Sequence, residues 1–175
     1  MKLIINPKAE LKIRIAMKHA KIYEIMWFGE IHKNKTGNFI LKDVLFPPQE
    51  NQIAFVTTDD KRFPKWIFNH IVKKNKAKDI RLHGHTHPTF NTNPSAIDKK
   101  HIDTFLKESK DYYIQMILSN EYKPYCVLHT KTKTGYTTKK LPIIWNYTLK
   151  IKKVMIGVMN INEPQQTSGV LWPYQ

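Results

Sequence analysis

Residues 83–98 read His83-Gly84-His85-Thr86-His87-Pro88-Thr89-Phe90-Asn91-Thr92-Asn93-Pro94-Ser95-Ala96-Ile97-Asp98. The pattern predicts a strand over 80–87, followed by a helix that opens near Ser95. Because alternate residues of a strand share a face, His85 and His87 point the same way, and Asp98 in the first helical turn can reach the same point. Two imidazoles and one carboxylate leave a fourth position open for water, which is typical of catalytic zinc sites.

Each of these residues also has an ordinary structural explanation. Ser95 and Asp98 match the pattern of a capping box at a helix start, and a histidine pair on a strand can be exposed or satisfied in the core. The complete set falls within fourteen residues, and this joint occurrence favours a metal site. His83 extends the alternation; it could replace a ligand, but we expect it to support the site or lie at its rim. We interpret His101 and Asp103 as residues of the helix surface.

The rest of the chain mixes predicted helices and strands. A helix is predicted over 8–19, with Leu11, Ile15 and Lys18 or His19 in the i, i+4 rhythm of its buried face. The other predicted elements are strands over 23–31 and 39–46 joined by a turn at 33–38, a strand over 53–57, a helix over 63–74, and strands over 112–119 and 125–130. Residues from Leu141 onward are weakly patterned and predict an irregular tail or an added strand. The expected fold is one α+β domain with a central, mostly antiparallel sheet flanked by helices.

Length and composition limit the class of protein. The chain has 175 residues, of which 41% are hydrophobic and 11% aromatic, as expected for one domain with its own core. No apolar run approaches the ~18 residues that span a bilayer, and no signal-like stretch develops before Pro7. Cys126 is the only cysteine, so no internal disulfide can form. We expect a cytoplasmic protein without a membrane partner.

Basic residues outnumber acidic ones by 29 to 14, which gives a formal net charge of +15. A nucleic-acid partner is one explanation, because clustered cations release counterions from phosphates. The basic residues are 26 Lys but only 3 Arg, accompanied by 12 Asn, whereas base readout favours the planar fork of Arg. Lysines spread over solvated faces are therefore the favoured interpretation, and the charge can still steer acidic partners toward the protein.

The segment His85-Thr86-His87, followed after seven residues by Ser95 and after two more by Asp98, resembles the JAMM motif of the JAB/MPN metalloprotease family, His-(Ser/Thr)-His-x7-Ser-x2-Asp. The family also carries a glutamate far upstream, where a strand begins after the first helix. Tyr23-Glu24-Ile25-Met26-Trp27-Phe28-Gly29 resembles that element, so Glu24 is the candidate. Glu30 lies six residues further along on the same predicted face, and periodicity alone does not choose between the two glutamates.

The resemblance covers roughly residues 8–130. Later stretches that look like elements of prokaryotic and phage-type members are 40–50, 112–119 and 125–129. The resemblance implies a JAB/MPN-like domain over 1–140, with a C-terminal extension over 141–175 that belongs to the same domain or forms a tail. The chain departs from the family at Trp27, where small residues are common, and near Ile31, where a second glycine is missing.

The resemblance implies a zinc-dependent peptidase or isopeptidase, similar to a deubiquitinase, that cleaves an amide at the C-terminal tail of a ubiquitin-like protein. It implies one zinc ion per chain, held by His85, His87 and Asp98. Glu24 is then the general base that activates water, and Ser95 is the hydrogen-bond donor to the oxyanion. Small substrate residues are expected near the scissile bond because three aromatic side chains could crowd the channel to zinc: Trp27, Phe28 and Phe90.

Three other functions stay open at this point. A catalytically silent MPN scaffold would bind a partner, although it would have no physical need for Glu24, Ser95 and the three ligands together. A nucleic-acid-associated protein similar to RadC would share the His-x-His-Pro and Pro-Ser-x-x-Asp segments, and the net charge is compatible with it. A metal-dependent hydrolase of small amides would need the same metal site.

Overall fold

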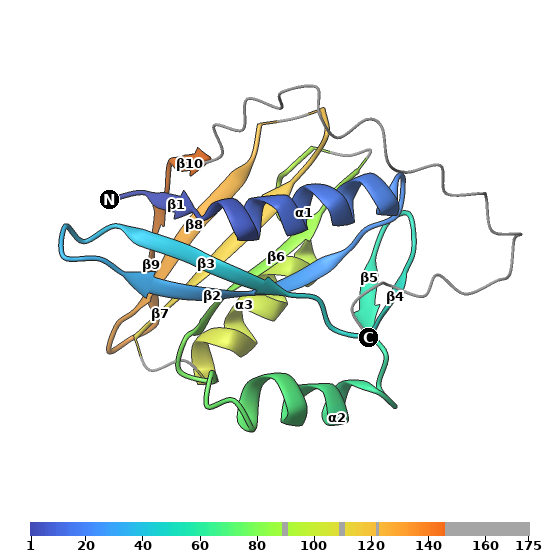
Figure 1. The fold of residues 1–175 in the computed structure, drawn as a ribbon. Helices are drawn as coiled ribbons and strands as arrows, with labels where there is room; N and C mark the ends of the chain where they lie inside the picture. The colour runs from blue at the N-terminus through green and yellow to red at the C-terminus, as the bar shows by residue number, and fades with distance from the viewer. Residues whose placement is uncertain (89–90, 109–110, 122, 146–175) are drawn as a thin grey trace, which may run out of the picture.

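One eight-stranded sheet organises the chain, with helix α1 on one face and helix α3 on the other (Figure 1). The computed structural model describes residues 1–88, 91–108, 111–121 and 123–145. The strands of this sheet are β1 (Leu3–Ile5), β2 (Met26–Lys33), β3 (Phe39–Leu45), β6 (Ile80–Thr86), β7 (Tyr112–Leu118), β8 (Tyr125–Lys131), β9 (Tyr136–Lys140) and β10 (Ile143–Trp145). A separate two-stranded sheet consists of β4 (Gln49–Asn51) and β5 (Val56–Thr58). The helices are α1 (Pro7–Ala20), α2 (Phe63–Ile67), which continues as a π-helical segment (Phe68–Val72), and α3 (Ala96–Glu108).

The large sheet is mixed, with the strand order β10-β1-β3-β2-β6-β7-β8-β9. Four of its seven pairings are antiparallel, and the parallel ones join β10 to β1, β1 to β3, and β6 to β7. Strands β6 and β7 can be parallel because α3 carries the chain back across the sheet between them. The predicted α+β single domain is confirmed.

Helix α1 starts where the sequence places a cap. The Asn6 side chain accepts a hydrogen bond from the backbone N–H of Lys8 at 2.9 Å, and Pro7 occupies the first turn. The predicted buried face was wrong, since Leu11 is 45% exposed. The buried stripe is Ala9, Ile13, Ala16 and Ala20. Three alanines give a weak hydrophobic signal, but their small side chains let the helix lie close to the sheet.

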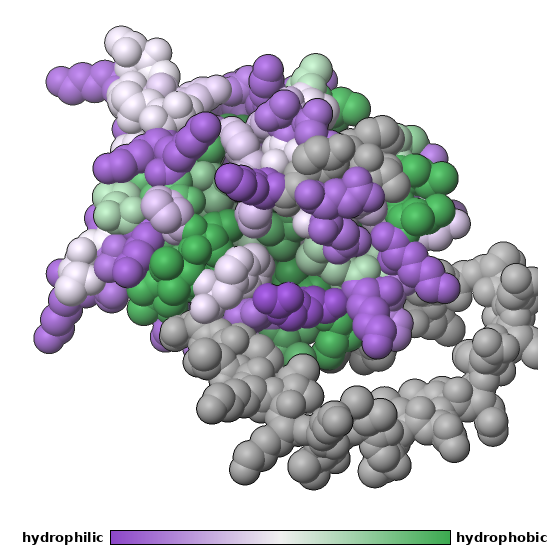
Figure 2. All heavy atoms as spheres, turned by 90° about the horizontal axis from the view of Figure 1, so that it is seen from above, coloured by the Kyte–Doolittle hydropathy of each residue, from purple (hydrophilic) through white to green (hydrophobic). Residues whose placement is uncertain are grey.

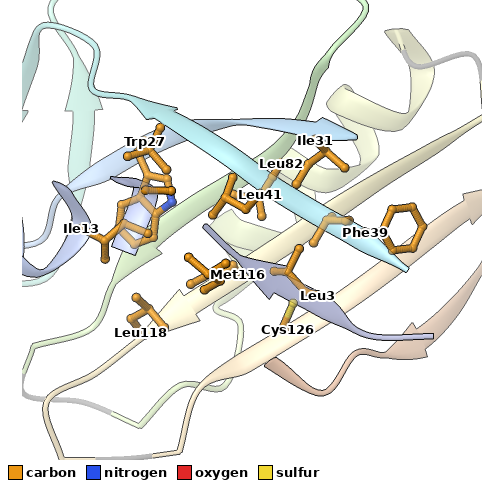
Figure 3. Close-up of a cluster of buried hydrophobic side chains, with 14 of the residues drawn as sticks. Leu3, Ile13, Trp27, Ile31, Phe39, Leu41, Leu82, Met116, Leu118 and Cys126 are labelled. Atoms are coloured by element: carbon orange, nitrogen blue, oxygen red, sulfur yellow. The ribbon is translucent and has the colours of Figure 1, made fainter. Parts of the chain in front are cut away.

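The main core lies between α1 and the sheet (Figure 3). Trp27 is fully buried there, and Gly84 is its neighbour on the adjacent strand. A Cβ atom at Gly84 would overlap the indole ring of Trp27, so a glycine is required where the ring crosses β6. The indole thus packs on the α1 side of the sheet, away from the alternating histidines of β6.

Several short elements differ from the sequence prediction. The strand predicted over 53–57 is a hairpin, β4 and β5, that stands apart from the large sheet. The helix predicted over 63–74 changes to π-helical hydrogen bonding after Ile67. Strands β1, β9 and β10 were not identified, apart from the added strand considered after Leu141. β10 pairs with β1, so residues 143–145 belong to the sheet; the rest of the predicted extension, from 146, lies outside the described residues, as does Phe90.

Hydrophilic side chains are spread around the molecular face seen from above and do not gather in one patch (Figure 2). None of the helices within the described ranges is long and apolar enough to cross a membrane.

Candidate metal centre

The β6–α3–β7 unit brings the candidate ligands together at the carboxyl end of β6, an interior strand of the sheet. His85 lies in β6 and His87 directly after it, and the backbone N–H of His87 donates to the Leu118 carbonyl of β7 at 2.8 Å. Asp98 lies in the first turn of α3. Since a helix that follows a strand begins beside the carboxyl end of that strand, the carboxylate reaches the two imidazoles. All three residues are at least nine-tenths buried.

The three candidate ligands are in direct contact. The Nε2 atoms of His85 and His87 are 3.1 Å apart. His85 Nε2 lies 3.1 Å from Asp98 Oδ1, and His87 Nε2 lies 3.7 Å from Asp98 Oδ2. These contacts place two nitrogen atoms and one carboxylate around a single point.

The donor set fits zinc. Tetrahedral ligands at the usual Zn–N distance of about 2.0–2.1 Å are separated from one another by about 3.3 Å. The two imidazole nitrogens are 3.1 Å apart, close to this value, and with one Asp98 carboxylate oxygen they form a set of potential ligand atoms within 4.8 Å of one another. Three protein ligands with a fourth position left for water or substrate are the composition of a catalytic site, whereas structural sites close all four positions.

Asp98 is both a candidate metal ligand and a helix-capping residue, the two roles that the sequence left open. Its Oδ2 accepts a hydrogen bond from the backbone N–H of Ser95 at 2.7 Å, and its own N–H donates to Ser95 Oγ at 3.1 Å. This reciprocal pair is a capping box at the start of α3. Burial would raise the pKa of Asp98, but hydrogen bonds from His85, His87 and Ser95 hold it far below the usual range. The carboxylate therefore stays negative while it caps the helix.

Glu24 reaches the same point from the residues that precede β2. Its Oε1 lies 4.0 Å from His87 Nε2, beside the three ligands. Reciprocal hydrogen bonds fix this approach: Ile25 N–H donates to Thr86 Oγ1, and Thr86 N–H donates to the Ile25 carbonyl, both at 3.0 Å. Burial raises the pKa of Glu24 to about 7, with His87 lowering it and Asp98 raising it. A carboxyl group with this pKa can both accept and release a proton near neutral pH.

Glu30 lies elsewhere. Its carboxylate is 2.6 Å from Lys76 Nζ and 3.5 Å from His32 Nε2, and with Asp79 and His32 it forms a second group of potential ligands. The Lys76 ammonium already neutralises the Glu30 carboxylate, so this second group does not need a metal ion for its charge. Periodicity could not separate Glu24 from Glu30 because Glu24 precedes the strand and the register of β2 shifts on both sides of Glu30.

Some residues that hold the site carry no signal in the sequence. His87 Nδ1 lies 2.7 Å from the Asn91 carbonyl, and such a bond fixes ring orientation and leaves Nε2 free for a metal. The buried Gln49 side chain accepts from Met26 N–H at 2.7 Å and donates to the Met26 carbonyl at 3.1 Å, so its amide pairs with the start of β2. Only Thr86 could have been found, because it stands between the two histidines of the motif.

His83 and His101 lie beside the ligands. His83 is 6% exposed and packs between the Phe28 and Phe105 rings, with centroids 5.9 and 5.2 Å away. Burial lowers the pKa of His83 to about 3, so the ring is neutral. His101 is exposed, as predicted, but faces the site, with its ring 6.2 Å from that of His83. Asp103 is exposed as well.

The ligands line an open cavity of about 300 Å³. Glu24 and Ser95 line it together with His85, His87 and Asp98. Trp27 does not, since it is fully buried on the other side of the sheet, so the expectation that it crowds the channel is wrong. Phe28 lines an adjoining cavity instead.

No protein-family model matches this sequence, and no curated protein matches it significantly. Among solved structures, the solution structure of protein DSY2949 from Desulfitobacterium hafniense is similar over 85% of this chain and 95% of its own, with a TM-score of 0.53 and 16% sequence identity. At this identity the likeness concerns the fold alone. Membership of the JAB/MPN family stays a prediction from the motif.

Proposed function

We propose that the protein is a zinc-dependent peptidase or isopeptidase of the JAMM type. One observation carries the proposal: His85, His87 and Asp98 converge at zinc-compatible separations, with Glu24 beside them, in a cavity open to solvent. A metal that served only the fold would not need a further carboxylate beside its three ligands, lining the same open cavity.

The chain's own residues suit amide hydrolysis. When bound, zinc would supply Lewis-acid activation of water and of the scissile carbonyl. Glu24 accepts the proton of the attacking water on its carboxylate and passes it to the departing amine. The Ser95 hydroxyl accepts the Asp98 N–H through a lone pair, which leaves its proton free to donate to the carbonyl oxygen as negative charge develops.

The substrate we propose is the extended C-terminal tail of a ubiquitin-like protein. Strand β5 has a strand neighbour on one side only, among the described residues, and Val56 of β5 lines the ligand cavity. An extended tail can add beside such an edge through main-chain hydrogen bonds. The basic surface would speed encounter with a partner that has an acidic face.

Zinc content and turnover of paired variants test the proposal. We expect elemental analysis to find about one zinc per chain in the wild type and far less in His85→Ala or His87→Ala. Glu24→Gln should keep zinc and lose turnover by about 10²-fold or more, whereas the matched variant Glu30→Gln should keep both. The substrates are fusions of ubiquitin-like proteins to a reporter, with cleavage mapped by mass spectrometry.

Different outcomes remove different parts of the proposal. A wild-type protein that takes up no zinc on reconstitution would end the metallopeptidase assignment. Loss of turnover in Glu30→Gln, with Glu24→Gln unaffected, would overturn the assignment of the base. Cleavage of short unrelated peptides, with every fusion intact, would leave a general metallopeptidase and remove the ubiquitin-like substrate.

A further inference from the structure

A second cavity continues from the metal centre. It measures about 750 Å³ and shares Met26, Val56, His83 and His101 with the ligand cavity. The mechanism proposed above uses no residue that lines only this second part. A peptide bound across both cavities would therefore place one side chain in the second cavity, while its backbone lies beside His85, His87 and Asp98 in the first.

The floor of the second cavity is aromatic. Phe28 and Phe63 are stacked, with ring centroids 6.2 Å apart, and Phe105 meets Phe28 edge to face at 6.4 Å. All three are only partly buried. Aromatic faces open to a cavity bind aliphatic stems, and they also attract cations through the negative potential of the ring.

The rim of this cavity is acidic. Three carboxylates, those of Glu50, Asp59 and Asp60, line it with one lysine, Lys61, whereas the whole chain has 14 acidic residues against 29 basic ones. Asp59 is engaged by Arg62, at 2.6 Å. Glu50 and Asp60 make no ion pair within the described part of the chain, so their charges remain available to a ligand.

A buried polar group also faces this cavity. His83 is 94% buried, yet its imidazole makes no hydrogen bond to any described residue, and it lines both cavities. Its ring nitrogens are not among the fully enclosed, unpartnered polar atoms of the described residues, so they are reached from the cavities. His83 thus offers a hydrogen-bonding group at the junction, where a peptide backbone passing from one cavity to the other would run.

We propose that the second cavity is a specificity pocket for a lysine or arginine side chain of an extended peptide, next to the amide that reaches the metal centre. This inference rests on the proposed peptidase function. The aliphatic stem of the basic residue packs on the Phe28, Phe63 and Phe105 rings, and its cationic head lies between Glu50 and Asp60. Nucleic acid is disfavoured as the ligand, because the same carboxylates repel phosphate.

Peptide binding to the Glu24→Gln variant tests the inference without relying on catalysis. The probes are fluorescein-labelled eight-residue peptides of glycine and alanine that carry a single lysine at each position in turn, with norleucine in the matched set. Norleucine has an aliphatic stem of similar length and no charge. Fluorescence anisotropy should show one register in which lysine binds about three- to tenfold more tightly than norleucine, as two partly exposed ion pairs give.

Substitutions in the second cavity test whether the preference for lysine over norleucine arises there. We expect the lysine advantage to disappear when Glu50→Gln and Asp60→Asn are combined, and to persist in a control of equal charge change, Glu108→Gln with Glu121→Gln, at exposed positions outside both cavities. Phe63→Leu should weaken lysine and norleucine peptides alike. Melting temperatures show whether each variant is folded.

The inference and the proposed function can fail separately. Equal binding of lysine and norleucine in every register, no binding of any lysine peptide, or a lysine preference that survives Glu50→Gln with Asp60→Asn would overturn the pocket. The pocket would also be overturned if a labelled oligonucleotide bound more tightly than the lysine peptide and displaced it. A lysine preference that maps to this cavity, in a wild-type protein that cleaves no peptide or fusion, would support the pocket and remove the peptidase.

Discussion

Asp98 uses its two carboxylate oxygens for different partners. Oδ1 lies 3.1 Å from His85 Nε2, and Oδ2 accepts the Ser95 N–H at 2.7 Å. The start of α3 and the candidate metal centre therefore share one side chain. A capping aspartate is held in position by the backbone of its own helix, so this candidate ligand is already positioned without an ion.

Substitutions of Ser95 should separate helix capping from catalysis. Ser95→Ala removes the acceptor for the Asp98 N–H and should lower the free energy of unfolding by about 1 kcal/mol. Ser95→Asp keeps a capping acceptor but has no hydroxyl proton at neutral pH, so it should recover stability without recovering turnover. Denaturant titration and fusion cleavage are the two measurements. Full turnover in Ser95→Asp would contradict a donor role for the hydroxyl.

At this scale, local pattern predicts the convergence of His85, His87 and Asp98 better than it predicts their surroundings. Strand alternation fixes the common direction of His85 and His87, and a helix start fixes Asp98, because both rules act within a few residues. The side of the sheet taken by Trp27 depends on its neighbour Gly84, 57 positions later in the chain, which gives the indole room. Such a pairing depends on strand order, which no local pattern contains.

The β4–β5 hairpin is attached to the site through a side chain. Gln49 lies in β4, and its amide takes the place of a strand neighbour for Met26 at the start of β2. The Gln49 Nε2 also donates to the Pro47 carbonyl at 3.2 Å. The residues that precede β2, including Glu24, are thereby fixed relative to the hairpin, and the Glu24 N–H donates to the Gln52 carbonyl at 2.8 Å.

Gln49→Ala should therefore cost more than the loss of an exposed glutamine. It leaves the buried N–H and carbonyl of Met26 without partners, and we expect a loss of about 2–3 kcal/mol in the free energy of unfolding. Faster amide hydrogen exchange at Met26 should accompany it. The matched control is Gln52→Ala, at an exposed position whose backbone, and not its side chain, makes the hydrogen bonds to Glu24 and Phe55. Similar losses in both variants would contradict this role of Gln49.

Salt bridges hold helix α1 against β3, in addition to the packing of its alanines on the sheet. Lys12 Nζ and Lys8 Nζ lie 2.7 and 2.8 Å from the Asp43 carboxylate, and the Lys12 side chain is the less exposed of the two, at 23% against 66%. Burial would raise the pKa of Asp43, but hydrogen bonds from Lys12 and Lys8 hold it below its usual range. A carboxyl group with a lowered folded-state pKa stabilises the fold when ionised.

The contribution of Asp43 should depend on pH in a defined direction. Its stabilising effect is complete above the unfolded-state pKa, near 4, and is lost as the pH falls through the lower folded-state value. Asp43→Asn should lower the free energy of unfolding by about 1–2 kcal/mol at pH 7, and the difference from wild type should shrink below about pH 4. Chemical denaturation at several pH values measures this. A difference that grows toward low pH would have the wrong sign.

Elements with a strong local signal were predicted, and those held by distant partners were not. The capped helix α1, the β2–β3 hairpin and α3 each have turn or cap residues beside an apolar pattern. β1 and β10 are three residues long; β1 pairs with both β10 and β3, and β10 pairs with β1, so each exists through partners that are distant in the sequence. The buried face of α1 was misread because alanine contributes little to a hydrophobic pattern although it packs well.

The C-terminal end of the described chain completes the sheet. The Leu141 N–H donates to the Cys126 carbonyl at 2.9 Å, and its side chain is 3% exposed in the main core. Two residues later β10 begins, beside β1. The described chain thus contributes core residues beyond position 140, where the sequence pattern weakens.

Leu141→Ala should lower the free energy of unfolding by about 2–4 kcal/mol, because it leaves a cavity beneath the end of the sheet. Ile144→Ala is the control, since Ile144 is 40% exposed, and should cost less than about 1 kcal/mol. Thermal and denaturant unfolding measure both. A Leu141→Ala variant as stable as Ile144→Ala would mean that this segment contributes nothing to the core.

During synthesis, the edge of β1 that pairs with β10 stays unpaired until β10 has been translated. Ile143, which pairs with Leu3, is translated 140 residues after it. At about 5–20 residues per second, the ribosome needs on the order of ten seconds to cover this interval. Until then β1 can lie against β3 but leaves one row of peptide groups open to other chains. Slow translation or premature release before Ile143 should thus favour aggregation of the nascent chain, and sedimentation of products truncated at residue 140 would show it.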